Sequence, residues 1–203
     1  MRVQGRRYCI VVRGKSHTEV PSVLGGTPVE THGDVTVLTV DVRDSSHLCG
    51  LLDRLREDPR RASIGFDLGG RVVDVIPSPG HDEPAVTWYD RATRLLLTGD
   101  TLYPGRLYVD DWPAFTATVD RLLAFAEDHP VGHLLGAHIE MTRSPGVDYV
   151  IRTTYQPEEP PLELGVADLR ALRRAIEEVG DTPGIHPHEK FVLYHGVPDR
   201  HFG

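Results

Sequence analysis

The chain has 203 residues, 39% hydrophobic and 26% charged, with a formal net charge of −8 at pH 7. This length and balance predict one globular α/β domain rather than a disordered chain. The negative charge argues against nucleic acid or an anionic membrane as a partner, and no apolar run has transmembrane length. Only two cysteines occur, Cys9 and Cys49, without a CxxC motif, which favours a reduced, cytoplasmic protein.

The first third of the chain predicts two strands and one short helix, separated by polar loops. Strands are expected at 8–12 and 35–42, where apolar and β-branched residues gather. The stretch 21–28 is typical of turns, and leucines spaced three and four apart predict an amphipathic helix at 47–55. The apolar run near the N-terminus is too short for a signal peptide, so we expect no export.

The rest of the chain alternates predicted strands with predicted helices. One helix is expected after Asp111, with an apolar face, and stops at Pro130; another ends at Gly180. An aromatic loop at 102–109 and an irregular, proline-bearing segment at 142–161 interrupt the pattern. This order predicts sheet layers flanked by helices. The expected strands cover 71–76, 87–90, 95–98, 131–135 and 191–194, and the second helix covers 166–179.

Three metal-competent side chains follow the ends of predicted strands, each directly after a glycine or alanine: His81, Asp100 and His138. Glycine lets the backbone turn sharply and approach an ion closely. Imidazole and carboxylate are ordinary zinc ligands, and the two oxygens of an aspartate can bridge two ions. A single such residue is more simply a capping or turn residue. Their repetition at three strand ends predicts a metal site at one edge of a sheet.

These residues carry a family resemblance. The sequences P-G-H at 79–81, L-L-T-G-D-T at 96–101 and G-A-H at 136–138 resemble, in order and spacing, the third to fifth metal-binding motifs of the metallo-β-lactamase superfamily. The resemblance implies an αββα sandwich in which His81, Asp100 and His138 bind metal, with Asp100 as the bridging ligand.

The resemblance also implies a domain plan. It is strong over residues 66–155 and looser beyond, so residues 1–203 are expected to form one metallo-β-lactamase-like domain. Within it, 1–65 would be a divergent N-terminal part, 66–155 the metal-motif core, and 156–203 a C-terminal helix and strand.

The N-terminal part departs from the family pattern. The stretch that best resembles the family's second motif, H-x-H-x-D-H, is K-S-H-T-E-V at 15–20. H-G-D at 32–34 is a weaker candidate, because it is shorter and lies nearer the third motif. The resemblance therefore implies His17 as a metal ligand and Glu19 in place of the catalytic aspartate. Lys15 replaces the first histidine, where it would bind a substrate anion or substitute for the charge of a missing ion.

The short N-terminus has its own consequence. Only about fourteen residues precede Lys15. Either the N-terminal β-layer of the sandwich is incomplete, which we expect, or the start lies inside a longer gene, or the N-terminus is rebuilt. An incomplete layer leaves a sheet edge that invites pairing with another chain, which predicts a homodimer.

The resulting hypothesis is a hydrolase with one or two zinc ions; iron and manganese fit the same ligand types. A metal-bound hydroxide would attack an ester, thioester, lactone or amide bond of a small-molecule substrate, with Asp100 and Glu19 as catalytic residues. The alternative, favoured by the degenerate second motif, is a metal-poor, catalytically weak relative that acts as a binding or scaffold protein.

Residues close to the motifs in sequence are candidates for the pocket. Tyr103, Arg106 and Tyr108 follow Asp100 and are expected to form the pocket wall and bind substrate. The tyrosines alternatively only pack the loop. Glu140, two residues past His138, is expected to contact a metal ligand or, more simply, to form a surface salt bridge.

Overall fold

The structure is a computed structural model that describes residues 6–13, 27–32, 35–42, 63–68 and 70–197. Lys15, His17 and Glu19 lie outside the described residues, as does the helix predicted at 47–55. The predictions made for them therefore stay predictions.

The chain divides into two compact units, which are described separately. The first comprises Met1–Pro77 and Trp88–Thr93, and the second comprises Ser78–Thr87 and Arg94–Gly203. Strand β6 (Val86–Asp90) contributes residues to both. The prediction of a single domain stays a prediction.

The first unit begins with a three-stranded antiparallel sheet in the order β1-β3-β2. Strands β1 (Arg6–Arg13) and β3 (Val35–Val42) confirm the two predicted strands. Strand β2 (Thr27–His32) overlaps a stretch predicted as turn, and its pairing with β3 shifts register just after Pro28, which has no N–H for the ladder. The expectation of an incomplete β-layer stays a prediction.

Buried carboxylates of the first unit are paired with arginines. Strands β4 (Ile64–Asp67) and β5 (Val72–Pro77) form an antiparallel pair. Asp74 of β5 is 1% exposed and accepts two hydrogen bonds from Arg91, both 2.7 Å long. This hydrogen bonding raises the pKa of Arg91.

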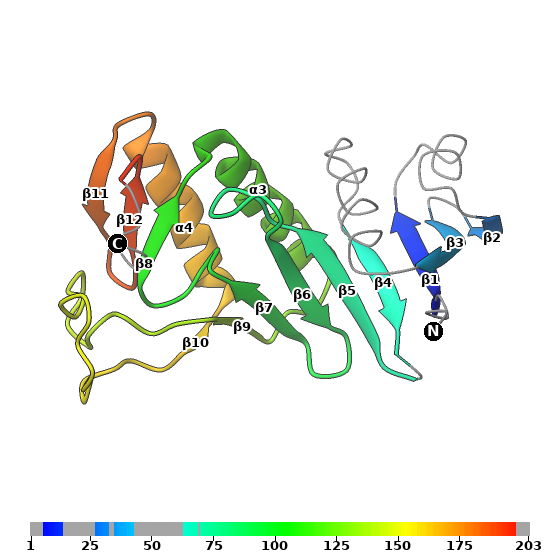
Figure 1. Cartoon of the computed structure of the whole chain (residues 1–203), viewed down its shortest axis with the longest axis horizontal. Helices are drawn as coiled ribbons and strands as arrows, with labels where there is room; N and C mark the ends of the chain where they lie inside the picture. Colours follow the sequence, from blue (N-terminus) through cyan, green and yellow to red (C-terminus); the bar gives the residue numbers. More distant parts are fainter. Residues whose placement is uncertain (1–5, 14–26, 33–34, 43–62, 69, 198–203) are drawn as a thin grey trace, which may run out of the picture. The chain divides into compact units, whose positions relative to one another are not determined.

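The second unit contains the strands that carry the predicted metal motifs (Figure 1). Strand β7 (Leu95–Gly99) runs parallel to β9 (His133–Gly136), and β9 pairs antiparallel with β10 (Glu163–Leu164). A second set has the order β11-β12-β8, in which β8 and β12 are parallel. Its strands are β8 (Arg106–Val109), β11 (Gly184–Pro187) and β12 (Val192–His195).

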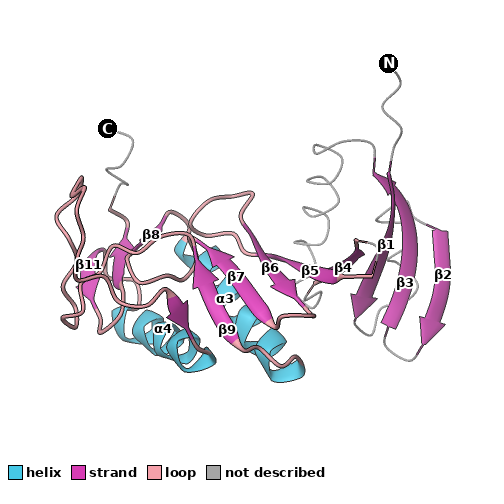
Figure 2. Ribbon diagram, turned by 90° about the horizontal axis from the view of Figure 1, so that it is seen from below, coloured by secondary structure: helices cyan, strands magenta, loops and turns pink. Residues whose placement is uncertain are grey.

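Two helices lie on one side of β7 and β9 (Figure 2). Helix α3 (Trp112–Asp128) begins directly after Asp111, as predicted, and the Asp111 side chain caps it by accepting a 2.9 Å hydrogen bond from the Ala114 N–H. Helix α4 (Val166–Val179) matches its prediction residue for residue. Both bury the predicted apolar stripe, through Phe115, Val119, Leu122 and Phe125 in α3 and Leu169, Leu172, Ile176 and Val179 in α4.

The mixed α/β class predicted from the sequence is confirmed by these sheets and helices. The prediction of a loop throughout 102–109 was wrong, because residues 106–109 form β8. All four of its residues are buried, including the charged Arg106, so the strand is covered on both faces and lacks the alternation that marks a half-exposed strand. Strand β11 was not predicted either. Among the described residues, no helix is long and apolar enough to cross a membrane.

Candidate functional site

The turn that carries His81 requires glycine at position 80. Gly80 has φ +132°, and a Cβ there would lie 2.5 Å from the Cα of Phe115 at the start of α3. Its carbonyl accepts hydrogen bonds of 2.8 and 3.0 Å from the N–H groups of Asp110 and Asp111. The sequence expectation of a tight glycine turn is confirmed, and the turn is fixed against the helix.

The ring of His81 is oriented by a backbone carbonyl. Its Nδ1 lies 2.8 Å from the Tyr108 carbonyl oxygen, which can only accept a hydrogen bond. Nδ1 therefore carries the proton, and in the neutral imidazole the lone pair is on Nε2. That Nε2 lies 3.7 Å from Oδ2 of Asp100. This is the arrangement by which proteins prepare a histidine to bind a metal ion.

Asp100 follows the end of β7 at a second glycine turn. Gly99 has φ +55°, and its carbonyl accepts a 3.0 Å hydrogen bond from the Ala137 N–H. This bond ties the segment that carries Asp100 to the segment that carries His138. The two strand ends are therefore held side by side, as the repeated motif pattern predicts.

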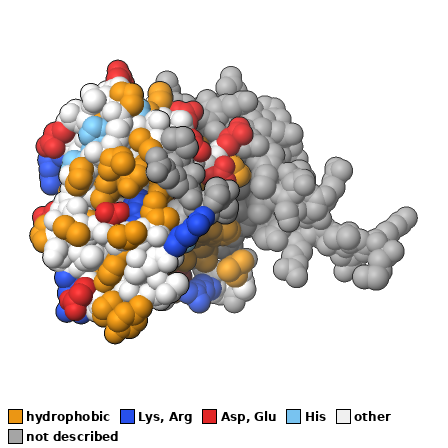
Figure 3. All heavy atoms as spheres, turned by 60° about the vertical axis from the view of Figure 1, so that its left-hand side comes forward, with side chains coloured by type: hydrophobic (Ala, Val, Ile, Leu, Met, Phe, Trp, Pro, Cys, Tyr) orange, Lys and Arg blue, Asp and Glu red, His pale blue; other side chains and the backbone are white. Residues whose placement is uncertain are grey.

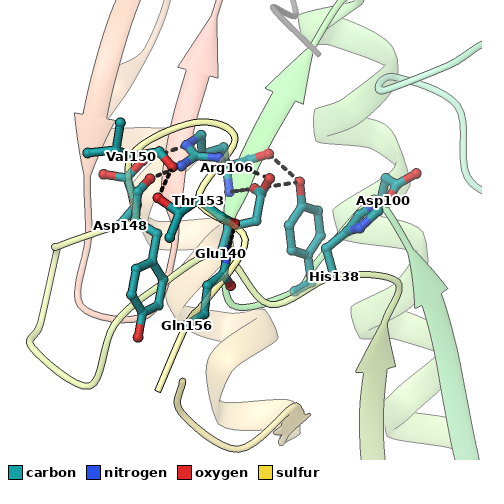
Figure 4. Close-up of polar contacts among 10 residues, drawn as sticks. Asp100, Arg106, His138, Glu140, Asp148, Val150, Thr153 and Gln156 are labelled. Atoms are coloured by element: carbon teal, nitrogen blue, oxygen red, sulfur yellow. Dashed lines mark hydrogen bonds and ion pairs between the residues drawn. The ribbon is translucent and has the colours of Figure 1, made fainter. Parts of the chain in front are cut away.

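The Asp100 carboxylate lies between two imidazoles. Nε2 of His138 is 3.2 Å from Oδ1 of Asp100, and Figure 4 shows the two side chains facing each other. Oδ1 is buried and makes no hydrogen bond. A buried carboxylate oxygen without a hydrogen bond is costly, and either a proton on the facing Nε2 of His138 or a bound cation would relieve that cost.

These residues fit a divalent cation in donor type and in the unpaired Oδ1 of Asp100. They do not form a closed ligand set: within the part of the chain that the structure describes, no three His, Cys, Asp or Glu side chains are grouped so as to hold a metal ion. His17 and Glu19, the further ligands implied by the family resemblance, lie outside that part.

An open pocket of about 250 Å³ adjoins His81 and Asp100. The Oγ of Ser78 is buried and lacks a hydrogen-bond partner, whereas Oγ1 of Thr98 donates to the Leu102 carbonyl at 2.6 Å. The described lining contains two carboxylates and no Lys or Arg: it is formed by Ser78, His81, Asp82, Pro84, Ala85, Val86, Thr98, Gly99, Asp100 and Thr101.

Tyr103, Arg106 and Tyr108 are placed in the interior rather than along this pocket. They are 3%, 2% and 2% exposed, and none of them lines the pocket beside Asp100. The structure favours the packing alternative for both tyrosines, and their contact with substrate stays a prediction without support from their positions. Arg106 is held by the carboxylates of Glu140 and Asp148.

Sequence reasoning missed three features of the site. The surface salt bridge expected for Glu140 is a buried one, since Glu140 is 9% exposed and pairs with Arg106 at 3.0 Å. The Tyr108 carbonyl that orients His81 is a backbone group, for which the sequence carries no signal. Ser78 and Thr98 could have been found, because they lie two or three residues from the metal-competent side chains.

Comparison with known proteins found one domain family and two similar proteins that are described here. Residues 7–57 match a family described as a domain of unknown function (DUF8691). A hydroxyacylglutathione hydrolase of Rhizobium meliloti (strain 1021) is 34% identical over 88 residues, which cover 39% of this chain and 34% of that protein. The chain thus spans about a third of the length of this relative.

Among solved structures, a metallo-β-lactamase from Pontibacter korlensis is similar, with 15% identity and a TM-score of 0.39. The match covers 57% of this chain and 46% of that one. The sequence match to the hydrolase agrees with the resemblance of the ordered motifs to the metallo-β-lactamase superfamily. Members of this superfamily are mostly metal-dependent hydrolases and commonly bind zinc.

Proposed function

We propose that the chain is a metal-dependent hydrolase that cleaves an ester, thioester, lactone or amide bond in a small molecule. The observation that supports this most directly is the Asp100 carboxylate, which faces the Nε2 atoms of both His81 and His138 and has one buried oxygen that makes no hydrogen bond. Similarity to a superfamily of mostly metal-dependent hydrolases supports the same proposal.

In this proposal His81, Asp100 and His138 hold zinc, with His17 and Glu19 as further ligands from the N-terminal loop. A bound zinc ion supplies Lewis acidity and lowers the pKa of a coordinated water. The chain's own residues prepare the site: the Tyr108 carbonyl keeps the proton of His81 on Nδ1, and the Gly99–Ala137 hydrogen bond keeps the two strand ends together. The adjoining pocket would receive the scissile bond.

Metal analysis tests this proposal. The purified protein should contain at least about one equivalent of zinc, iron or manganese, because two imidazoles and a carboxylate suit these ions. Added zinc should raise the melting temperature of protein stripped by a chelator, since a ligand that binds only the folded state stabilises it. The loaded protein should hydrolyse members of a generic ester, thioester and lactone panel.

A second candidate function is a metal-poor binding or scaffold protein. Two findings favour it: no complete metal-binding group forms within the described residues, and residues 7–57, which include the degenerate second motif, match a domain family of unknown function. Protein that binds less than about 0.2 equivalents of zinc, gains no stability from zinc and leaves the substrate panel intact would establish this candidate over the hydrolase.

The remaining expectations are part of the same proposal. A cytoplasmic location and a homodimer formed through a sheet edge both follow from the sequence arguments above. Solution scattering of the purified chain tests the second, because a monodisperse monomer contradicts it.

A further inference from the structure

Outside the metal motifs, two kinds of feature could indicate a further role: exposed hydrophobic side chains and buried clusters of polar side chains. On the face of the second unit seen in Figure 3, hydrophobic side chains are interspersed with charged ones, and no single large patch dominates the view. Among the described residues of this unit, the large exposed hydrophobic side chains are Leu97, Val147, Val150, Tyr155 and Ile185. The buried polar cluster around Arg106 carries an inference, because it borders the candidate site directly.

The imidazole of His138 needs support, since its side chain is 56% exposed. Besides Asp100, it contacts the ring of Tyr103, edge to face, with 5.3 Å between centroids and 64° between planes. Such aromatic pairs are favourable and directional. Tyr103 therefore forms a wall that restricts the positions the His138 ring can adopt.

Tyr103 is itself fixed by two glycines and two polar groups. A Cβ at Gly105 or Gly136 would lie 2.1 or 2.2 Å from its side chain, so the ring fills the space that these glycines leave. Its hydroxyl donates to the Arg106 carbonyl at 2.5 Å and faces Oε2 of Glu140 at 3.4 Å. Burial and the nearby Glu140 charge raise the pKa of Tyr103, so its hydroxyl remains a donor at neutral pH.

Glu140 joins this wall to the segment that carries His138. Its Oε2 accepts from the Arg106 N–H at 2.9 Å and its Oε1 from the guanidinium of Arg106 at 3.0 Å. Its own N–H donates to the Pro104 carbonyl at 2.7 Å. Figure 4 shows Arg106 between Glu140 and Asp148, with His138 towards the opposite side of Glu140.

We propose that Glu140 is a positioning residue for His138. It clamps residues 103–106 against the segment that follows His138 and so holds the Tyr103 ring where it fixes the imidazole beside Asp100. The effect of Glu140 on zinc affinity rests on the proposed function. Its effect on the contact between the Tyr103 and His138 rings does not, because that contact is measured in the metal-free protein.

The test compares Glu140→Gln with Asp120→Asn. Both changes remove one carboxylate charge from an arginine pair of the second unit, but Asp120 pairs with Arg173 on the helices, away from Asp100. In wild-type metal-free protein, proton NMR should show a cross-relaxation peak between the Tyr103 and His138 rings. Glu140→Gln should weaken that peak at least twofold and lower zinc affinity about 10–100-fold, the usual effect of losing a group that supports a metal ligand. Asp120→Asn should change neither.

The proposal is overturned if Glu140→Gln keeps both the ring contact and the zinc affinity within twofold of wild type. If the wild-type protein binds no metal, the proposed function fails, and the ring contact in the metal-free protein alone decides the role of Glu140. If Glu140→Gln does not fold, Tyr103→Phe replaces it. That variant keeps the ring but loses the hydroxyl that faces Glu140, and it should weaken the same contact; an unchanged contact and unchanged zinc affinity overturn the proposal.

Discussion

Two carboxylates of this chain, one in each unit, have opposite surroundings. Asp74 in the first unit is 1% exposed, and both its oxygens accept hydrogen bonds from Arg91. Asp100 in the second unit faces two imidazoles, and its buried Oδ1 accepts no hydrogen bond. Breaking a buried, fully hydrogen-bonded pair is destabilising, whereas a buried carboxylate oxygen that makes no hydrogen bond is itself a cost in stability. In the proposed function, this contrast distinguishes Asp74, which supports the fold, from Asp100, which would hold a metal ion.

The largest expected effect is the loss of hydrolysis in Asp100→Ala. The variant removes the carboxylate that both histidines face, so kcat/KM should fall by more than the about 10–100-fold typical of losing a residue that only supports a metal ligand. The free energy of unfolding of the metal-free protein should change by less than about 1 kcal/mol, because no hydrogen bond is lost from Oδ1. Urea unfolding and turnover of the most reactive panel substrate measure both. A large loss of stability without loss of turnover would remove the contrast with Asp74.

Gly80→Ala should be the most damaging change to stability. The new Cβ would lie 2.5 Å from the Cα of Phe115, at a φ of +132° that alanine rarely adopts. Overpacking and backbone strain together should cost about 3 kcal/mol of unfolding free energy. Gly132→Ala is the matched control, because its nearest neighbour would be 3.5 Å away, an ordinary contact. Equal melting temperatures for the two variants would contradict this prediction, because they would show that the turn before His81 accommodates a Cβ at position 80 without strain.

Asp74→Asn should behave as the reverse of Asp100→Ala. Breaking the buried pair of Asp74 and Arg91 should lower the free energy of unfolding by about 2–3 kcal/mol. This is at or below the lower end of the losses typical for buried ion pairs, because the Arg91 side chain is 36% exposed. Turnover per folded molecule should stay unchanged. Asp120→Asn, which breaks an ion pair in which the aspartate is 52% exposed, should cost less than about 1 kcal/mol in the same urea titration. Equal losses would mean that the burial of Asp74 contributes nothing.

The smallest expected effect is a pH dependence that involves Asp90. Hydrogen bonds from Arg71 and then from Thr93 lower the pKa of Asp90 below its ordinary value. A carboxyl group with a depressed folded-state pKa stabilises the fold above its unfolded-state pKa, near 4, and this contribution disappears as the pH falls further. Asp90→Asn should therefore be less stable than wild type at pH 7, with a smaller difference at pH 3. Urea unfolding at the two pH values measures it; a constant difference contradicts it.

The sequence predicted those parts of the fold in which a periodic pattern faces one core. Helix α4 was predicted to the residue, because four apolar positions at helical spacing end at a glycine. Strand β8 was missed, because its four residues are all buried and follow a Gly- and Pro-containing loop. Strand β11 contains two exposed residues and two prolines or glycines, so its pairing with β12 decides its conformation.

The candidate site was predictable to the extent that side chains alone define it. Asp100, His81 and His138 were found from glycine- or alanine-preceded strand ends, and the structure brings them together. The support around them was not predictable. The Tyr108 carbonyl is a backbone group, and the Arg106–Glu140 pair joins residues 34 positions apart that no local pattern relates.

The parallel pairing of β8 with β12 has a consequence for how the site is assembled during synthesis. Strand β8 carries the Tyr108 carbonyl that orients His81, and its neighbour in the β11-β12-β8 order is β12, about 85 residues later in the chain. Chains generally begin to fold from the N-terminus as they leave the ribosome. A nascent chain can already have made both turns that carry His81 and Asp100, yet the strand behind His81 gains its partner only when Val192–His195 emerges. In the proposed function, His81 would therefore be held in place for a metal ion only after most of the protein has been made.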